Sequence, residues 1–178
     1  LCLACSGFVY ALSTAFAFAS SQGVDKVLVL VGESMSHFSN PRDRVNFPLY
    51  GDAGTACLVE KGHFGDSTFI LTAGGEGEHV VLVPHGGHRF PITDESLIDK
   101  EREDGNFRRD ADITMDGLAT FNHAVTAIPK QVKQLLEVTG LTAEDFDYLV
   151  SHQANKFMID FIVKRLTFDV ATVHCCVA

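Results

Sequence analysis

Residues 4–12 read ACSGFVYAL, a stretch in which a cysteine comes just before an apolar pattern with helical spacing. From Phe8 to Ser20 the bulky residues recur every three or four positions, with small residues between them. Cys5 therefore lies at the predicted start of a helix, where the partial positive charge of the helix end lowers a thiol pKa and favours the nucleophilic thiolate. A buried structural cysteine is the commoner role of this residue type, so the local sequence leaves both roles open.

The segments after this helix predict an α/β arrangement. Residues 26–31, KVLVLV, predict a fully buried strand, and residues 52–60, DAGTACLVE, predict a second strand of small residues. Two shorter strands are expected at Phe69–Ala73 and Val80–Pro84. A strand that follows a helix and a nucleophile-like turn is typical of α/β proteins.

The remaining segments are predicted from turn, charge and capping signals. The polar, proline-containing stretch 34–48 predicts a loop, and the charged stretch 94–112 a surface excursion, with residues 99–104 on a solvated face. A long helix is expected over 118–138, bent by Pro129 and closed by Gly140. A capping arrangement follows at Thr142 and Asp145, and then come a strand at 148–150 and a helix at 155–166.

A histidine follows the predicted strand at 148–150. His152 lies in the sequence SHQAN at residues 151–155, between that strand and the next helix. Functional side chains of α/β proteins gather at the carboxyl ends of strands. On its own, His152 is as well explained as a hydrogen-bonded packing residue. Together with Cys5 it predicts a site, because a cysteine and a histidine far apart in sequence can converge on one acyl group.

Composition limits the classes of function. The chain has 178 residues, of which 46% are apolar and 21% charged, a globular balance. Its net charge of −9 argues against non-specific binding to nucleic acid or to anionic membranes. Five cysteines without regular spacing favour a reducing, cytoplasmic location over a disulfide framework. The apolar stretch 1–19 has no basic leader and is interrupted by polar residues, so we expect a fragment that begins inside a domain.

The sequence does not predict a metal site, although two groups of residues have ligand-like spacing. Cys2 and Cys5 form a C-x-x-C pair, but the other candidate ligands, residues 174–176, lie at the opposite end of the chain. His85 and His88 bracket two glycines, a spacing that is better explained by a solvated loop.

Five motifs follow one another along the chain: ACSGFVYAL at 4–12, NPRDR at 40–44 with YGDAGTA at 50–56, GGHRFP at 86–91, TMDG at 114–117 and HQAN at 152–155. In this order and spacing they resemble β-ketoacyl-acyl-carrier-protein synthase III, a Claisen-condensing family of the thiolase fold. The resemblance runs from about Cys2 to Leu166, and HQAN is its most diagnostic element.

The resemblance implies a mechanism and a set of site residues. Cys5 would take an acyl group from acyl-coenzyme A, and its backbone amide would contribute to an oxyanion site. His152 would help to decarboxylate a malonyl thioester carried by acyl-carrier protein and would stabilise the enolate. Arg44 would hold the coenzyme A nucleotide, and Gly117 and Asn155 would line the pantetheine channel. The product would be a 3-oxoacyl-acyl-carrier protein that initiates fatty acid biosynthesis, with no cofactor, in a homodimer when complete.

The resemblance also implies an incomplete α/β thiolase-like fold. Residues 1–112 would be the C-terminal part of the N-terminal half and 113–166 the first part of the C-terminal half, followed by an unmatched tail at 167–178. The family's third catalytic residue, an asparagine in Gly-Asn-Thr, has no counterpart in this sequence. We attribute these departures to truncation at both ends or to a frame error near Leu166.

A further departure concerns the carrier protein. Phe157 stands where the family often has an arginine that receives the carrier protein, and Ser151 replaces a usual proline. The basic residues that could form a substitute docking patch are Lys156, Lys164 and Arg165. Two alternatives to an active synthase stay open: a non-catalytic remnant that only binds coenzyme A or partners, and a related polyketide- or quinolone-type synthase.

Overall fold

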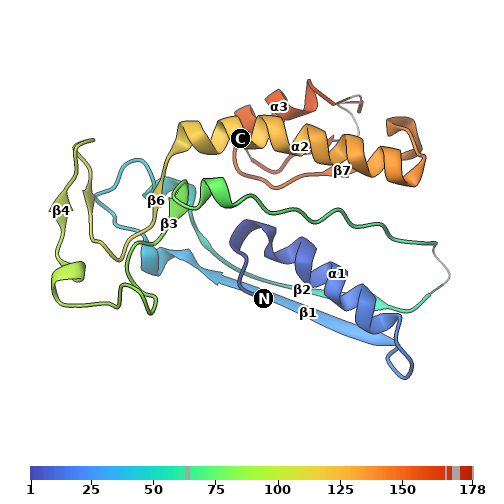
Figure 1. The fold of residues 1–178 in the computed structure, drawn as a ribbon, viewed down its shortest axis with the longest axis horizontal. Helices are drawn as coiled ribbons and strands as arrows, with labels where there is room; N and C mark the ends of the chain where they lie inside the picture. The colour runs from blue at the N-terminus through green and yellow to red at the C-terminus, as the bar shows by residue number, and fades with distance from the viewer. Residues whose placement is uncertain (63–64, 167, 170–172, 178) are drawn as a thin grey trace.

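The computed structural model describes residues 1–62, 65–166, 168–169 and 173–177. Within these residues the chain forms three α-helices and eight strands (Figure 1). The helices are α1 (Gly7–Ala19), α2 (Gly117–Thr139) and α3 (Lys156–Val163). The strands are β1 (Lys26–Ser34), β2 (Asp52–Glu60), β3 (Val81–Leu82), β4 (Lys100–Glu101), β5 (Phe107–Arg108), β6 (Thr114–Met115), β7 (Leu149–Val150) and β8 (Val173–His174).

The N-terminal layer is an antiparallel β1–β2 ribbon covered on one face by α1 (Figure 1). The two strands pair without a bulge from Lys26 opposite Glu60 to Ser34 opposite Asp52. Small residues of α1 allow the helix to approach the ribbon closely, and the buried core consists of Ala15, Ala19, Val29 and Val59. The predicted helix and the predicted strand at 52–60 are therefore both confirmed.

The prediction that the strand at 26–31 is fully buried is wrong for this chain. Val29 faces α1 and is 7% exposed, whereas Leu28 and Leu30 on the opposite face are 60% and 72% exposed. Leu58, which pairs with Leu28 across the ribbon, is also exposed. Successive side chains of a strand point to opposite faces, and among the described residues only one face of this ribbon is covered.

The strand predicted at Phe69–Ala73 does not form. This segment runs unpaired between α1 and α2 (Figure 1), where side chains hold it. Tyr10 Oη donates to the carbonyl oxygen of Thr72 at 3.3 Å, and the Phe16 and Phe69 rings pack edge to face. Pairing in the predicted strand at Val80–Pro84 is limited to β3, which pairs with β6. Apolar β-branched sequence alone does not make a strand where no neighbouring strand supplies a ladder.

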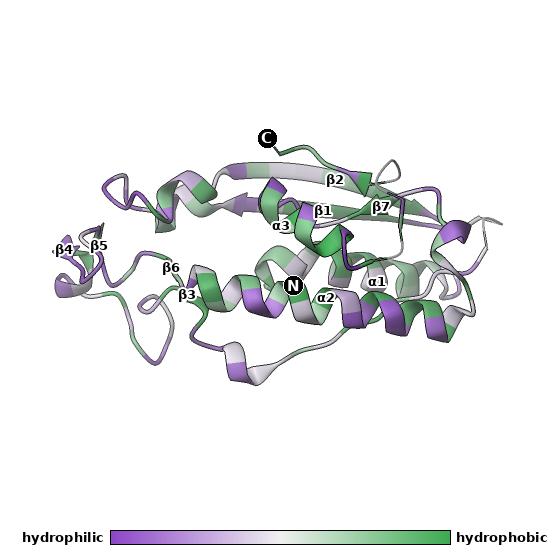
Figure 2. Ribbon diagram, turned by 90° about the horizontal axis from the view of Figure 1, so that it is seen from above, coloured by the Kyte–Doolittle hydropathy of each residue, from purple (hydrophilic) through white to green (hydrophobic). Residues whose placement is uncertain are grey.

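Residues 94–113 form a lobe with the β4–β5 hairpin, in which residues 99–104 are exposed or half-buried, as expected of a solvated face, while two charged residues after them are buried. Asp112 is 1% and Arg108 9% exposed, and both are buried against the turn at 39–46. Figure 2 shows this β4–β5 end of the molecule as mostly hydrophilic. Charged residues tolerate such burial because they pair with one another.

Helices α2 and α3 form the second layer and pack through an aromatic cluster. Phe121 of α2 stacks on Phe157 at 5.6 Å and meets Phe161 edge to face at 5.2 Å. Helix α2 begins at the capping side chain of Asp116, continues through Pro129 and ends at Gly140, whose φ is 70°. The predicted capping box of Thr142 and Asp145 is present in the 3₁₀ turn Ala143–Asp145.

Strand β7 pairs in parallel with β8, so α3 lies in the connection between them. Helix α3 ends at Val163, three residues before the predicted end, and residue 167 lies outside the described residues. The remaining short 3₁₀ turns are Ala4–Ser6, Met35–Phe38, Phe47–Leu49, Gly75–Gly77 and Glu95–Leu97. No helix in the described part of the chain is long and apolar enough to cross a membrane.

Candidate active site

Cys5 lies in the 3₁₀ turn Ala4–Ser6, which leads directly into α1. The turn is tight because Ser6 donates to the carbonyl oxygen of Leu3 through both its backbone N–H, at 3.2 Å, and its Oγ, at 2.9 Å. Ala4 has a φ of 45°, a left-handed conformation that residues other than glycine rarely adopt. Such backbone strain occurs at functional sites, where the surrounding structure holds a side chain in a required position.

His152 lies in the loop between β7 and α3, as the sequence predicts. The next residue, Gln153, braces this loop. Its Nε2 donates to the carbonyl oxygens of Ser151 at 3.0 Å and His174 at 3.1 Å, and its Oε1 accepts from Cys176 N at 2.7 Å. The sequence predicted the histidine but not the brace, because nothing local indicates that residue 153 meets residues 174–176.

The fold brings the side chains of Cys5 and His152 near enough for each to shift the pKa of the other. Hydrogen bonding by His152 lowers the pKa of the Cys5 thiol, and the nearby imidazolium charge lowers it further, against the opposing effect of burial. The same hydrogen bond raises the pKa of His152. The pair therefore favours a thiolate next to an imidazolium, the reactive form of a cysteine nucleophile.

Two further residues near Cys5 were missed by the sequence analysis. The carboxylate of Glu33, at the end of β1, raises the pKa of the Cys5 thiol and so opposes His152. Burial, with a smaller effect of the Cys5 charge, raises the pKa of Tyr50, whose hydroxyl lies 3.7 Å from Met115 Sδ. Tyr50 directly precedes the glycine-rich strand motif, and this position is the only signal that could have found it.

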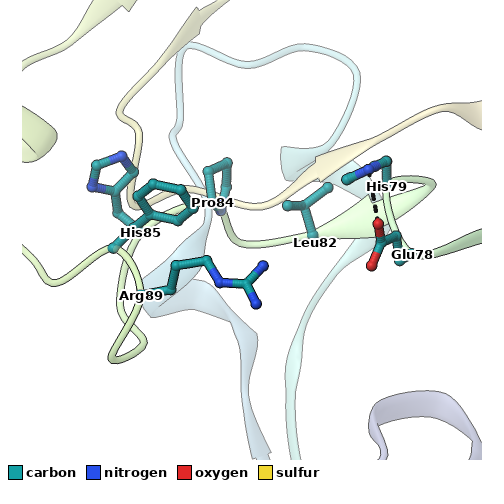
Figure 3. Close-up of a pocket in the computed structure, with 7 residues that line it drawn as sticks. Glu78, His79, Leu82, Pro84, His85 and Arg89 are labelled. Carbon is teal, nitrogen blue, oxygen red and sulfur yellow. Dashed lines mark ion pairs between the residues drawn. The ribbon is translucent and has the colours of Figure 1, made fainter.

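Two hollows in the surface are candidate binding sites. One, of about 200 Å³, lies beside the nucleophile turn and is lined in part by Ala4, Gly7 and Glu33. The other, of about 520 Å³, lies near β3 and includes neither Cys5 nor His152 in its wall. Figure 3 shows His79 and His85 of this second hollow at opposite ends, so they do not converge on one point.

The residues expected to bind coenzyme A occupy three different positions. Arg44 is exposed in the turn before β2, Gly117 is the first residue of α2, and Asn155 is the N-cap of α3. The Asn155 side chain accepts a hydrogen bond from Met158 N at 2.8 Å, so it also starts the helix that follows His152. Their roles toward coenzyme A stay predictions.

The three basic residues expected at the docking patch differ in availability. Lys156 lies 3.3 Å from Asp160, and Lys164 is exposed at the C-cap of α3. Arg165 turns toward α2, where it donates to the carbonyl oxygen of Val125 at 2.8 Å and lies over the Phe161 ring. Arg165 thus ties the two helices together, and Lys164 is the freest of the three. Carrier-protein docking by this patch also stays a prediction.

Comparisons with known proteins point to one family. A family model described as 3-oxoacyl-[acyl-carrier-protein (ACP)] synthase III matches residues 1–75. A beta-ketoacyl-[acyl-carrier-protein] synthase III of Chlamydia muridarum is 35% identical over 170 residues, which are 94% of this chain and 49% of that protein. The chain therefore spans about half the length of the curated relatives it matches.

Solved structures extend the similarity to the fold. A 3-oxoacyl-(acyl-carrier-protein) synthase III superposes with a TM-score of 0.90 at 30% identity, over 97% of this chain and 52% of that one. The priming beta-ketosynthase of the R1128 polyketide pathway gives 0.72 at 30% identity, over 95% and 47%. The expected thiolase-like α/β fold is confirmed.

Proposed function

Because the chain belongs to the 3-oxoacyl-[acyl-carrier-protein] synthase III family, we propose that it carries the acyl-accepting half of a decarboxylative Claisen condensation. The observation that carries this proposal is the contact between Cys5 and His152, which come from segments 147 residues apart. The substrates would be an acyl-coenzyme A and a malonyl-acyl-carrier protein, in the cytoplasm, in a homodimer of the complete protein.

In the first step the Cys5 thiolate attacks the carbonyl carbon of the acyl thioester. The new bond joins Cys5 Sγ to the acyl carbon, and the bond to the sulfur of coenzyme A breaks. The imidazolium of His152 gives its proton to the departing thiolate, so free coenzyme A thiol leaves and His152 becomes neutral. His152, which stabilises the Cys5 thiolate, therefore also supplies the proton that the leaving group needs.

In the second step a malonyl thioester loses carbon dioxide and forms an enolate. An N–H of neutral His152 donates to the developing enolate oxygen, and the enolate carbon attacks the acyl group on Cys5. The Cys5 thiolate is released as the new carbon–carbon bond forms. In the family this step uses an asparagine as well. The sequence has no Gly-Asn-Thr, and the residues that follow β8 include Cys175 and Cys176.

Labelling of the cysteine tests the proposal. The complete protein that contains this chain is incubated with radiolabelled acyl-coenzyme A, and the label is located by mass spectrometry. We expect the label on Cys5 and its loss in Cys5→Ala. Cys2→Ala is the matched control, since Cys2 is also exposed and lies three residues away. Unchanged labelling of Cys5→Ala, or label on Cys57, would sink the assignment.

The isolated 178-residue chain is expected to show no condensing activity. Misplacing a transition-state donor by about an ångström already costs on the order of a hundredfold in rate. Turnover by the isolated chain close to that of a complete synthase would contradict this expectation. Such an inactive chain would fit the alternative of a remnant that only binds coenzyme A or partners.

A polyketide-type synthase is the second catalytic candidate, and similarity to the R1128 priming ketosynthase favours it. A panel of acyl-coenzyme A primers separates the two, because labelling of Cys5 by short straight-chain primers alone would favour fatty acid initiation.

A further inference from the structure

The turn at 40–46 is organised around one buried carboxylate, that of Asp43, which is 1% exposed. Its Oδ1 accepts from the backbone N–H groups of Val45 at 3.0 Å and Asn46 at 3.1 Å, and its Oδ2 accepts from Asn46 Nδ2 at 2.8 Å. A carboxylate that accepts three hydrogen bonds fixes the backbone around it. Residue 44 lies between Asp43 and Val45, whose N–H is the first donor to this carboxylate, so the backbone of residue 44 has little freedom.

The charge on Asp43 is neutralised from the lobe. Arg108 of β5, which is 9% exposed, forms an ion pair with Asp43 through Nε and a second hydrogen bond through Nη2 at 3.2 Å. The same Nη2 also donates to Asp104 Oδ2 at 2.5 Å. The same hairpin sends Asn106 Oδ1 to accept from the backbone N–H of Arg44 at 3.0 Å. The hairpin thus holds the turn at two points, the buried Asp43 carboxylate and the backbone of the exposed Arg44.

The turn carries two arginines, and the lobe contacts the guanidinium of only one of them. Arg42 lies 3.3 Å from Asp99, with its guanidinium 3.5 Å from the centre of the Phe107 ring. The guanidinium of Arg44 is exposed and makes no hydrogen bond or ion pair with any residue that the structure describes. The fold therefore fixes the backbone of Arg44 and leaves its charged end open.

We propose that Arg108 is a positioning residue for nucleotide binding: through Asp43, and together with Asn106, it holds the 40–46 turn so that Arg44 faces a phosphate-bearing ligand. This inference rests on the proposed function, in which Arg44 binds the nucleotide of coenzyme A. The lobe then has a role in the site, although none of its residues need touch the reacting atoms. A fixed guanidinium loses less freedom when it binds phosphate than a mobile one.

Direct binding tests the proposal without requiring catalysis. Adenosine 3′,5′-bisphosphate, the nucleotide end of coenzyme A, is titrated calorimetrically into the full chain and its variants. Arg44→Ala should weaken binding about tenfold, the effect of losing one charge-assisted contact. Arg108→Ala and Asn106→Ala should weaken it to a similar extent, and Arg108→Lys should partly restore it. Lys100→Ala is the control, because Lys100 pairs with Asp110 in the same lobe but not with the turn.

Arg108→Ala leaves the buried Asp43 carboxylate without its partner, so this variant could fail to fold. Asn106→Ala then keeps the test decisive, because it removes only the hydrogen bond to the Arg44 backbone. Hydrogen exchange should be faster at the amides of residues 44–46 in the Asn106 and Arg108 variants than in the control. Binding equal to wild type in both, or equal weakening in Lys100→Ala, overturns the proposal.

A second substrate separates this inference from the proposed function. In the complete protein, acyl transfer to Cys5 is compared for acyl-coenzyme A and for the same acyl group on N-acetylcysteamine, which lacks the nucleotide. The Arg108 and Asn106 variants should raise KM for acyl-coenzyme A and leave kcat and the N-acetylcysteamine reaction unchanged. Equal losses with both substrates refute the positioning role. If neither substrate acylates Cys5 in the wild-type protein, the proposed function is refuted instead. The calorimetric titration of the nucleotide then still decides the role of Arg108.

Discussion

At Cys5 the thiol lies between an imidazole that stabilises its charge and a carboxylate that opposes it. The hydrogen bond from His152 has the largest effect on its pKa, and the net direction is downward despite burial and Glu33. The pKa of His152 moves upward through the same bond. The charged form of Cys5 thus exists at a lower pH than that of a free cysteine.

Alkylation kinetics check this effect. The rate of Cys5 modification by iodoacetamide should rise with pH along a curve whose midpoint lies below that of an ordinary thiol. In His152→Ala the main cause of the lowered pKa is gone, so the midpoint should move up and the rate at pH 7 should fall about tenfold or more. Modification of Cys2 in the same samples is the internal control. An unchanged midpoint for Cys5 in His152→Ala would contradict the pairing.

At the level of elements, the sequence predicted the features that depend on neighbouring residues and missed those that depend on a partner far along the chain. Helix α1, strand β2 and the stop of α2 at Gly140 were predicted because periodicity and capping act within a few residues. The unpaired run at 69–73 was mispredicted because a strand depends on a partner elsewhere in the chain. The Asp43–Arg108 pair joins positions 65 residues apart, so the local sequence does not reveal that these two charged residues are buried together.

The site shows the same division. Cys5 and His152 were found through their positions at a helix start and a strand end, and through the motif order. Their convergence was inferred from the family and not from spacing. The brace by Gln153 depends on the parallel β7–β8 pair, which local sequence does not reveal.

The end of α2 offers a test of one local signal. Gly140 has a φ of 70°, and a Cβ there would meet no neighbouring atom within 4 Å, so strain comes from the backbone alone. Gly140→Ala should lower the free energy of unfolding by about 1 kcal/mol, as expected for a residue with a side chain in this region. Gly87→Ala is the control, because its space is equally open and its φ is not positive. Equal effects of the two changes in denaturant titrations would contradict the explanation.

The molecule as a whole buries little of its surface. Its accessible area is 12772 Å², whereas a compact monomer of 19.4 kDa has about 8,500 Å². The exposed side of the β1–β2 ribbon is part of the excess, with Leu28, Leu30 and Leu58 more than half exposed. Contiguous apolar surface of this kind promotes association between chains.

Substitution on this face checks that statement. The double variant Leu28→Lys, Leu30→Lys should reduce the fluorescence of a hydrophobic dye bound to the chain and lower its average mass in light scattering. Val138→Lys on α2 is the control, since Val138 is 63% exposed but lies outside the ribbon. A reduction of the same size in the control would show that added charge, and not the ribbon face, is responsible.

The brace between Gln153 and Cys176 also sets the order in which the site can mature during synthesis. The β1–β2 ladder has all its residues once Glu60 has been made, whereas the brace needs 116 more. At about 5–20 residues per second this takes roughly 6–23 s. For the first 92 of these residues His152 has not been made, and until the brace forms the loop that carries His152 is not held, so Cys5 remains an ordinary, slowly reacting thiol. Nascent chains stalled after Glu60 should therefore show slow Cys5 alkylation, and chains that have released Cys176 from the ribosome should show fast alkylation. A nucleophile activated by a residue 147 positions further along the chain is thus protected from acylation until that segment has been made.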